Sequence, residues 1–371
     1  SFFILIHLND KNKKFIYIII MKITIDCRML SSGGIGTYLQ SLLPFFIKNY
    51  ECTLLLKSKD LDTYKNISNL KTILCDIPTF SIKELFSFPK SLLAEINSCH
   101  AFYSPYCNIP GGIRIPIFTT IHDVVFLDIP GLSGKLGTIA RKWFYQHAIN
   151  KSKTIFTVSQ FSKERIKHHL KLKKTPVIVT YNAVPDWFKD GIKNNVEKTD
   201  TILFVGNIKK HKGLHTLVAA YKKLLSSDFP GKLMIVGNAS NFRTSDDSIS
   251  QELNSLPEDS VIYTGRISDN ELKTKYAEAK LLIQPSLYEG FGMPPMEALS
   301  LGTNVVISNI PVFKEIYKDL PVTYFEVENP EELADKIKSA YNQNVPDFSN
   351  PYSFEKTFNI INDMLKQIQH N

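Results

Sequence analysis

The sequence predicts an α/β protein of two Rossmann-like, doubly wound parallel-sheet domains that face each other across a cleft. Short apolar runs rich in β-branched residues alternate with helical patterns along the chain, which is typical of parallel sheets with helices on both faces. A polar stretch at residues 190–200 interrupts this alternation and reads as a linker. The length of 371 residues also favours two domains over one.

We expect residues 21–190 to form the first domain. It opens with the strand-like run KITID, followed by a glycine-containing loop and a segment with helical spacing. The later strand candidates are short and rich in Val, Ile, Thr and Phe. The expected elements are strands at 22–26, 52–57, 101–105, 115–123, 154–159 and 176–182, and a helix at 36–49.

Residues 191–352 restart the alternation and are expected to form a second domain. Its strand candidates again carry β-branched residues and end in Gly, Asn, Arg or Ser. Residues 353–371 have apolar side chains at the spacing of a packed helix. The expected strands are 201–207, 232–238, 261–266, 280–286 and 304–308, with helices from Leu214, over 269–279 and around Glu297.

Residues 1–20 stand apart from this pattern. Their apolar runs are separated by NDKNKK and are too short to span a bilayer, and a secretory signal would need a basic leader and a small-residue cleavage site. We expect an upstream extension, either read-through before Met21 or a disordered segment, with a short membrane-touching tail as the alternative. Five cysteines without a CxxC pair predict reduced thiols in the cytoplasm, and favour neither disulfides nor a zinc site.

Chemistry is expected at the carboxyl ends of the strands, where doubly wound sheets bind ligands. The segment 286–302, SLYEGFGMPPMEALSLG, is the most informative. A strand leads into a glycine loop and then a helix, with two prolines in its first turn and Gly302 to end it. Backbone N–H groups at such a helix start bind phosphate, and carboxylates bind hydroxyl pairs. A ligand with phosphates between two polyols, a nucleotide sugar, fits this segment.

Each glutamate of this segment also has an ordinary explanation. Glu297 would favour a helix dipole from the first turn, and Glu289 could be a solvated loop residue. The combination of strand, Glu-Gly-Phe-Gly, double proline, second glutamate and terminal glycine favours the functional interpretation.

The segment resembles the signature of retaining glycosyltransferases of glycosyltransferase family 4, which have the GT-B fold. That signature places two glutamates, separated by seven residues, at a strand-to-helix junction, and Glu289 and Glu297 have this spacing. The resemblance spans nearly the whole chain from Met21, and its most specific part is residues 263–316. It implies that the closing helix, 353–371, crosses back onto the first domain.

The resemblance implies catalytic roles for three residues. Glu289 would bind hydroxyls of the donor sugar, His122 would orient that sugar, and Lys212 would pair with the diphosphate. His122 alone could equally be a hydrogen-bonded histidine at a strand end. Glu297 would bind the ribose, and backbone groups near Arg266 would flank the base. The other donor-binding residues implied are Gly34, Gly36, Gly206, Asn207, Phe291, Gly292 and Met293.

One position departs from the family pattern. Asn207 stands where many relatives have an arginine that binds the diphosphate. Two outcomes stay open: Lys209 or Lys210 compensates, or phosphate binding rests more on Lys212. The resemblance implies neither a metal nor another cofactor, because Lys212 and helix dipoles would neutralise the leaving nucleoside diphosphate. It also implies a front-face reaction with retention, in which the leaving phosphate helps to deprotonate the acceptor.

The positive charge of the chain, formally +8, is concentrated in one region. Residues 135–174 carry eleven Lys and Arg residues against Glu164 alone. Each such cation adds about 1 kcal/mol of attraction near an anionic membrane. We predict that this region rests on the cytoplasmic face of the cell membrane, where a lipid-linked saccharide acceptor would lie. The alternative is a set of solvated helix faces, and a nucleic acid partner is disfavoured because the sequence carries no nucleic-acid-reading motif.

The segment GNIKKHKG and the first strand and loop are most similar to mannosyltransferases of bacterial O-antigen or capsule assembly, so GDP-mannose is the expected donor. UDP-glucose, UDP-galactose and UDP-N-acetylhexosamines stay open. A catalytically silent relative that binds a nucleotide sugar or acts as a scaffold is the main alternative. An epimerase would need an acid and base set that is not evident, and a dehydrogenase would need the full dinucleotide fingerprint.

Overall fold

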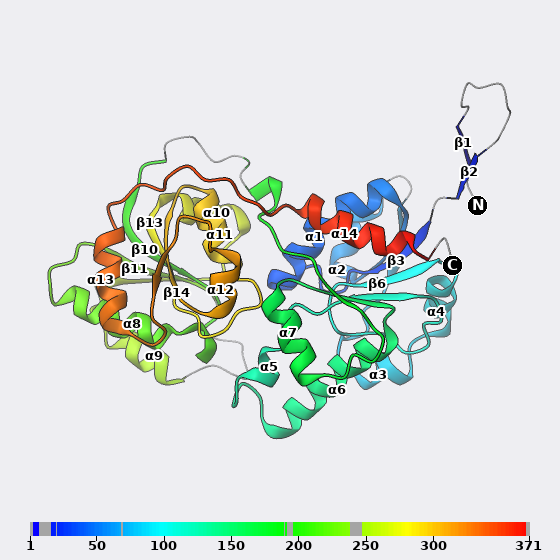
Figure 1. Cartoon of the computed structure of the whole chain (residues 1–371), viewed down its shortest axis with the longest axis horizontal. Coiled ribbons are helices and arrows are strands. Elements are labelled where there is room, and N and C mark those ends of the chain that lie inside the picture. The colour runs from blue at the N-terminus through cyan, green and yellow to red at the C-terminus, as the bar shows by residue number, and fades with distance from the viewer. Residues whose placement is uncertain are drawn as a thin grey trace.

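The computed structural model describes residues 3–6, 16–19, 21–67, 70–188, 190, 196–237 and 247–368. Within these ranges, two parallel sheets lie side by side along the long axis of the molecule, and each has helices packed on its faces (Figure 1). The predicted fold class, two Rossmann-like doubly wound domains, is confirmed.

The N-terminal sheet runs in space through β5 (Leu70–Leu74), β4 (Glu51–Leu56), β3 (Lys22–Asp26), β6 (Ala101–Ser104), β7 (Ile117–Thr120), β8 (Thr154–Thr157) and β9 (Val177–Val179). All neighbouring pairs are parallel. The inner strands β6, β7 and β8 are buried along their whole length, which explains their continuous apolar and β-branched sequences. The strand order turns at β3, so a switch-point crevice lies at the carboxyl ends of β3 and β6.

The helices of this domain are α1 (Gly33–Asn49), α2 (Ser58–Tyr64), α3 (Ile82–Phe86), α4 (Lys90–Asn97), α5 (Val125–Asp128), α6 (Lys135–Lys151), α7 (Gln160–His169) and the 3-10 turn η1 (Asp186–Phe188). Helix α1 begins at Gly33, three residues earlier than expected. Gly36 therefore lies inside the helix, where a Cβ would be 2.2 Å from the carbonyl oxygen of Leu30. This glycine allows close packing of the first helical turn instead of forming a loop.

The C-terminal sheet runs through β12 (Val261–Gly265), β11 (Lys232–Val236), β10 (Thr199–Val205), β13 (Ala279–Gln284), β14 (Asn304–Ser308) and β15 (Thr323–Phe325), all in parallel. This is the strand order of dinucleotide-binding folds. The switch point lies between β10 and β13, so the loops that follow these two strands border the expected ligand crevice.

Helices cover both faces of this sheet as well. They are the turns η2 (Lys210–Lys212) and η3 (Glu258–Ser260), with α8 (Leu214–Leu225), α9 (Asp247–Asn254), α10 (Asp269–Glu278), α11 (Met293–Ser300), α12 (Pro311–Ile316) and α13 (Pro330–Ala340). Helix α10 begins with a capping box, in which Ser268 and Glu271 satisfy each other's backbone N–H groups.

The last helix, α14 (Phe354–Lys366), returns to the N-terminal domain and packs on α1 (Figure 1). Phe358 is buried there, with its ring centroid 5.5 Å from that of Phe45 and 5.2 Å from that of Phe46. The Tyr50 hydroxyl donates to the side-chain oxygen of Asn362. The final helix thus supplies part of the first domain's core.

Several features differ from the expectations or fall outside them. The sequence patterns do not reveal β5 and β15, because both are short edge strands and β5 is mostly exposed or half-buried. Upstream of Met21, β1 (Phe3–Ile6) and β2 (Ile16–Ile19) pair as an antiparallel hairpin separate from both large sheets. The rest of residues 1–20 and residues 191–195 of the expected linker, 190–200, lie outside the described residues.

Removing the aromatic contact between α14 and α1 should destabilise the N-terminal domain. We expect Phe358→Ala to lower the free energy of unfolding by about 3–5 kcal/mol, because a buried aromatic ring leaves a cavity. Urea unfolding followed by far-UV circular dichroism measures this loss. Asn359→Ala, at an exposed position of the same helix, is the matched control and should change stability by less than about 0.5 kcal/mol.

Candidate active site

The loop between β13 and α11 has a backbone that only glycine can complete. Gly292 has φ +84°, and a Cβ there would lie 2.3 Å from Cε1 of Phe313. Helix α11 then begins at Met293. Because Pro294 and Pro295 have no N–H, the N–H groups of Gly292 and Met293 are the backbone donors at this helix start.

The loops that follow β10 and β13 are held together at the switch point. Gly213, with φ +68°, approaches the second loop so closely that a Cβ would lie 1.8 Å from the carbonyl oxygen of Pro285. The Leu287 N–H donates to the carbonyl oxygen of His211 at 2.8 Å. These contacts bring the end of η2 alongside the loop that carries Glu289.

Lys212 and Glu289 form an ion pair across this junction, with Lys212 Nζ 2.8 Å from Glu289 Oε1. Ser286 Oγ donates to the same oxygen at 2.7 Å, and Gln284 Nε2 donates to it at 3.2 Å. Glu289 is 9% exposed. Its other oxygen, Oε2, accepts no hydrogen bond from the described residues, so it is the atom left for a ligand.

Glu289 is ionised in spite of its burial. Burial raises the pKa of this carboxyl, but the charge and hydrogen bond of Lys212, together with the Ser286 hydroxyl, outweigh that effect and bring the pKa below its ordinary value. An ionised carboxylate in this position is a strong acceptor for hydroxyl groups.

Glu297 has the opposite electrostatic environment. It lies on α11, half-buried, and its Oε2 accepts a hydrogen bond from the Tyr276 hydroxyl at 2.7 Å. Burial and the nearby charge of Asp269 raise its pKa to about 7, against the lowering effect of Tyr276. Near neutral pH this carboxyl therefore exchanges between the protonated and ionised forms.

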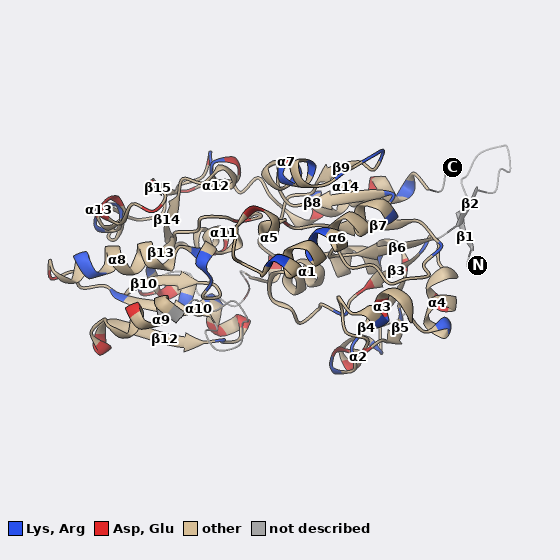
Figure 2. Ribbon diagram, turned by 90° about the horizontal axis from the view of Figure 1, so that it is seen from below, with Lys and Arg blue, Asp and Glu red and all other residues tan. Residues whose placement is uncertain are grey.

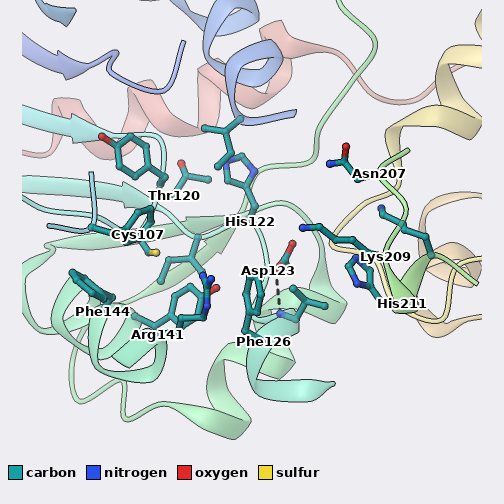
Figure 3. Close-up of a pocket in the computed structure, with 17 residues that line it drawn as sticks. Cys107, Thr120, His122, Asp123, Phe126, Arg141, Phe144, Asn207, Lys209 and His211 are labelled. Atoms are coloured by element: carbon teal, nitrogen blue, oxygen red, sulfur yellow. Dashed lines mark hydrogen bonds between the residues drawn. The ribbon is translucent and has the colours of Figure 1, made fainter. Parts of the chain in front are cut away.

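His122 follows β7 and points into the space between the domains (Figure 3). Its Nε2 lies 2.9 Å from the carbonyl oxygen of Pro105, which can only accept, so Nε2 carries the proton and Nδ1 is the acceptor. Burial lowers the pKa of this imidazole to about 4, so the ring is neutral. The adjacent Asp123 accepts the Val125 N–H at the start of α5, at 3.0 Å.

The two domains touch at the tip of the glycine loop. A Cβ on Gly290 would lie 2.9 Å from the carbonyl oxygen of His122, so glycine is needed for this contact. Ser159 Oγ donates to the Gly290 carbonyl oxygen at 2.7 Å. On α12, Glu315 accepts the backbone N–H groups of residues 160 and 161 at 2.7 and 2.8 Å, which neutralises the N-terminus of α7.

A pocket of about 410 Å³ lies between the domains beside this contact (Figure 3). The second domain contributes the side chains that follow β10, including Asn207 and Lys212, and the first contributes His122 and an aromatic wall. The aromatic wall consists of Phe80, Tyr106, Phe126 and Phe144, and Arg141 and Lys209 also line the pocket.

Phe80, in the aromatic wall, has a left-handed backbone conformation that a network of buried charged side chains holds in place. Phe80 has φ +60°, a conformation that costs about 1–3 kcal/mol for such a residue. Its N–H donates to Glu84 Oε2 at 2.9 Å, and Glu84 in turn bonds the buried guanidinium of Arg28 and the side chain of Asn108. Arg28 Nε also donates to Asp26 at 2.9 Å. This network fixes the position of the Phe80 ring in the pocket.

The structure brings some of the predicted site residues together and leaves others apart. His122, Asn207 and Lys212 line the pocket, and Glu289 joins them through its ion pair. Glu297 does not line it, and Arg266 is exposed after the edge strand β12.

The glycines and Phe291 that were predicted to bind the donor through their backbones lie in different environments. The Gly36 N–H already donates to the Ser32 carbonyl oxygen at 3.2 Å, so it is not available to a phosphate, in contrast to the expectation. The first-turn position Gly34 remains a candidate. At Gly206, a Cβ on the neighbouring Gly237 would lie 2.0 Å from its carbonyl oxygen, so that backbone is tightly packed. Phe291 is buried in the core of the second domain.

The sequence did not single out two residues that line the pocket, Arg141 and Phe80. Arg141 was only one cation of a basic region, and the strained Phe80 lies in a segment without a recognisable motif. Of the two lysines expected to compensate for Asn207, Lys209 lines the pocket and Lys210 is exposed outside it.

Replacing Lys212 with Met should destabilise the protein in a pH-dependent way. Glu289 would lose its cation, and we expect the free energy of unfolding at pH 8 to fall by about 3 kcal/mol. In the wild type, the lowered pKa of Glu289 stabilises the fold above the ordinary carboxyl pKa, and this is lost as pH falls through the lowered value. In the variant that pKa rises, so the loss should be larger at pH 8 than at pH 5 in urea unfolding.

The double variant Lys212→Met/Glu289→Gln is the control for this experiment. It removes both charges, and it should recover most of the lost stability. An equal loss for the single variant at both pH values would show that the ion pair is not its cause.

Comparisons with known proteins give the family of the chain. Residues 32–187 match the family described as Glycosyltransferase Family 4, and residues 186–352 match Glycosyl transferases group 1. The chain is 30% identical over 197 residues to O-antigen chain mannosyltransferase RfbU of Salmonella typhimurium, covering 53% of each protein. It is 25% identical over 231 residues to O-antigen chain mannosyltransferase B of Escherichia coli, covering 59% of this chain and 60% of that protein.

The matched region thus spans a little over half the length of these two relatives. Among solved structures, Anabaena Alr3699/HepE in complex with UDP and glucose superposes with a TM-score of 0.64 at 16% identity, covering 94% of this chain and 95% of that one. This likeness shows the fold. With adjacent family matches that together cover residues 32–352, the chain belongs to the glycosyltransferases of family 4 and group 1, which have the GT-B fold.

Proposed function

We propose that this protein is a retaining glycosyltransferase that moves a hexose from a nucleotide sugar to a lipid-linked saccharide during O-antigen or capsule synthesis. The observation that carries the proposal is the Lys212–Glu289 ion pair at the switch point, across the pocket from a neutral His122. It combines a cation for phosphate with two hydrogen-bond acceptors for sugar hydroxyls in one crevice.

The proposed roles follow from the atoms each residue leaves available. Lys212 uses one N–H on Glu289 and keeps others for the donor diphosphate. Glu289 Oε2 and His122 Nδ1 accept hydrogen bonds from the transferred sugar. Glu297 accepts the ribose hydroxyls further along α11, and the N–H groups of Gly292 and Met293 add to phosphate binding.

In the proposed reaction, the bond between the anomeric carbon and the diphosphate oxygen breaks while the acceptor oxygen attacks from the same face. Lys212 and the start of α11 stabilise the charge that develops on the leaving diphosphate. That diphosphate takes the proton of the acceptor hydroxyl. Asp123 is assigned an orienting role, since its Oδ1 already accepts the Val125 N–H. We propose that this chemistry requires no metal, which activity with and without a chelator tests.

GDP-mannose is our first candidate donor, and the relatives named O-antigen mannosyltransferases support it. UDP-glucose is the second, because a protein with the same fold was solved with UDP and glucose. UDP-galactose and UDP-N-acetylhexosamines complete the panel to be tested.

We further propose that the protein acts on the cytoplasmic face of the membrane, held by the basic region. Figure 2 shows Lys and Arg along α7, but Arg165 pairs with Asp128 and Lys167 with Glu164. Helix α6 (Lys135–Lys151) carries no acidic residue, so its cations are the better candidates for anionic lipid. None of the helices in the described parts of the chain is long and apolar enough to span a bilayer.

A catalytically silent nucleotide-sugar-binding or scaffold protein is the second candidate. The observation that favours it is Asn207, which is exposed at the pocket where many relatives carry a diphosphate-binding arginine. Such a protein would bind the donor without turning it over.

Donor turnover separates these two functions. We expect wild-type protein to release GDP from GDP-mannose, or UDP from one of the UDP-sugars, and Glu289→Gln to lower this rate at least about 100-fold because the sugar loses an anionic acceptor. Coupled nucleotide release measures the rate, with and without a chelator. Glu331→Gln, on the exposed face of α13, is the control. Binding without turnover by any donor would favour the silent protein.

Donor binding should strengthen with rising pH through Glu297. Its pKa of about 7 means that roughly a tenth of this carboxyl is ionised at pH 6 and nine tenths at pH 8. If the ionised form holds the ribose, calorimetry should show about tenfold tighter binding of the nucleotide sugar at pH 8. A nucleotide sugar is the right probe because its diphosphate does not titrate in this range.

Glu297→Gln should remove most of that pH dependence, because an amide does not ionise. An affinity that is the same at both pH values in the wild type would contradict the ribose role of Glu297.

A further inference from the structure

We propose that the pocket holds a second anion subsite, in which Arg141 binds a phosphate group of the acceptor. The inference rests on the proposed function and adds the chemical class of the acceptor: a phosphate-linked lipid saccharide. Its sugar would point toward His122, its phosphate would pair with Arg141, and its hydrocarbon chain would leave the pocket along α3 and α6.

The first argument is the charge balance of the pocket. Arg141, Lys209 and Lys212 all line it, and Lys212 is matched by Glu289. Asp123 is the acidic residue among the lining side chains. Arg141 forms no ion pair with a carboxylate in the described part of the chain, and its guanidinium lies 3.6 Å from the centroid of the Phe126 ring. A positively charged cavity of this kind attracts an anion.

The second argument is where Arg141 comes from. It lies on α6 of the first domain, whereas the lysines that would hold the donor diphosphate follow β10 of the second. Figure 3 shows Arg141 and Phe144 on one side of the pocket and Asn207, Lys209 and His211 on the other, with His122 and Asp123 between them. A guanidinium that contacts an aromatic ring in this way can still use its N–H groups for a bidentate phosphate contact.

The third argument is an apolar surface that continues from the pocket wall. Inside the pocket, the Phe80 and Phe144 rings meet edge to face at 5.4 Å between centroids. Phe144 then contacts Trp143 at 5.2 Å, and Trp143 is 47% exposed. The aromatic wall therefore reaches the outside of the molecule without a polar break.

Large apolar side chains lie exposed on the two helices around this exit. On α6, Leu136 and Ile139 are 83% and 65% exposed and share a helix face with Trp143. On α3, Ile82 and Phe86 are 79% and 76% exposed. Such exposure costs solvation free energy unless a partner covers it. Because this apolar surface continues from the cationic pocket, the partner that we assign to it is the hydrocarbon chain of a lipid phosphate.

The test uses farnesyl phosphate, farnesol and mannose 1-phosphate as probes, with saturating GDP present to occupy the donor site. Calorimetry of the full chain should show that farnesyl phosphate binds at least tenfold tighter than farnesol, which lacks the phosphate, or mannose 1-phosphate, which lacks the hydrocarbon chain. Arg141→Gln should weaken farnesyl phosphate and mannose 1-phosphate at least tenfold while changing GDP affinity less than twofold. Lys48→Gln, an exposed cation on α1 outside both the pocket and the basic region, is the control and should change neither.

The apolar part is tested separately. Leu136→Ser/Ile139→Ser should weaken farnesyl phosphate several-fold and leave mannose 1-phosphate unchanged. Circular dichroism and GDP affinity establish that each variant is folded.

Three results would overturn the inference. If the wild-type protein with GDP binds neither farnesyl phosphate nor mannose 1-phosphate, the pocket has no second anion subsite. If Arg141→Gln weakens the binding of GDP as strongly as the binding of the probes, Arg141 belongs to the donor diphosphate site. If Arg141→Gln leaves the affinity for farnesyl phosphate unchanged, Arg141 is not part of the acceptor site. Failure of the proposed function is distinguishable, because it would appear as loss of donor binding or turnover in wild-type protein without any acceptor probe.

Discussion

The two domains are joined at the tip of the glycine loop, where the Gly290 carbonyl group contacts Ser159, and the site lies beside this junction. The hydrogen bond is 2.7 Å long, and the missing side chain of Gly290 lets the backbone of His122 come within contact. The loop that carries Glu289 is thereby fixed against the first domain. The pocket takes Lys209 and Lys212 from the second domain and Arg141 and the aromatic wall from the first, so its shape depends on how the domains are held together.

The two glutamates of the signature, Glu289 and Glu297, differ in protonation because their surroundings differ. Glu289 receives Lys212, Ser286 and Gln284 on one oxygen, so it remains a carboxylate in spite of deep burial. Glu297 receives one hydroxyl, and burial brings its pKa to about 7. The first is a permanent acceptor suited to a sugar, and the second changes protonation state in the physiological range.

The sequence predicts features that depend on local pattern, and it does not reveal those that depend on tertiary approach. Strands that are buried on both faces can be predicted from their runs of β-branched residues, whereas the edge strands β5 and β15 lack such runs. The spacing of Glu289 and Glu297 is readable because it lies within one strand–loop–helix unit. Arg141 and Lys209 meet at a pocket only after both domains have folded, so no local pattern marks Arg141. Close helix packing and phosphate binding can both place a glycine in a first helical turn, so the local sequence around Gly36 does not distinguish them.

The return of α14 to the first domain has a consequence for how the chain is made. Phe358, Ile361 and Leu365 belong to the same buried cluster as Phe46 of α1, although the second domain separates them in the chain. A ribosome therefore releases the first domain with an uncovered apolar face, and that face is sealed only after the whole second domain has been translated. During this interval the nascent protein is a natural client for chaperones that recognise exposed apolar surface.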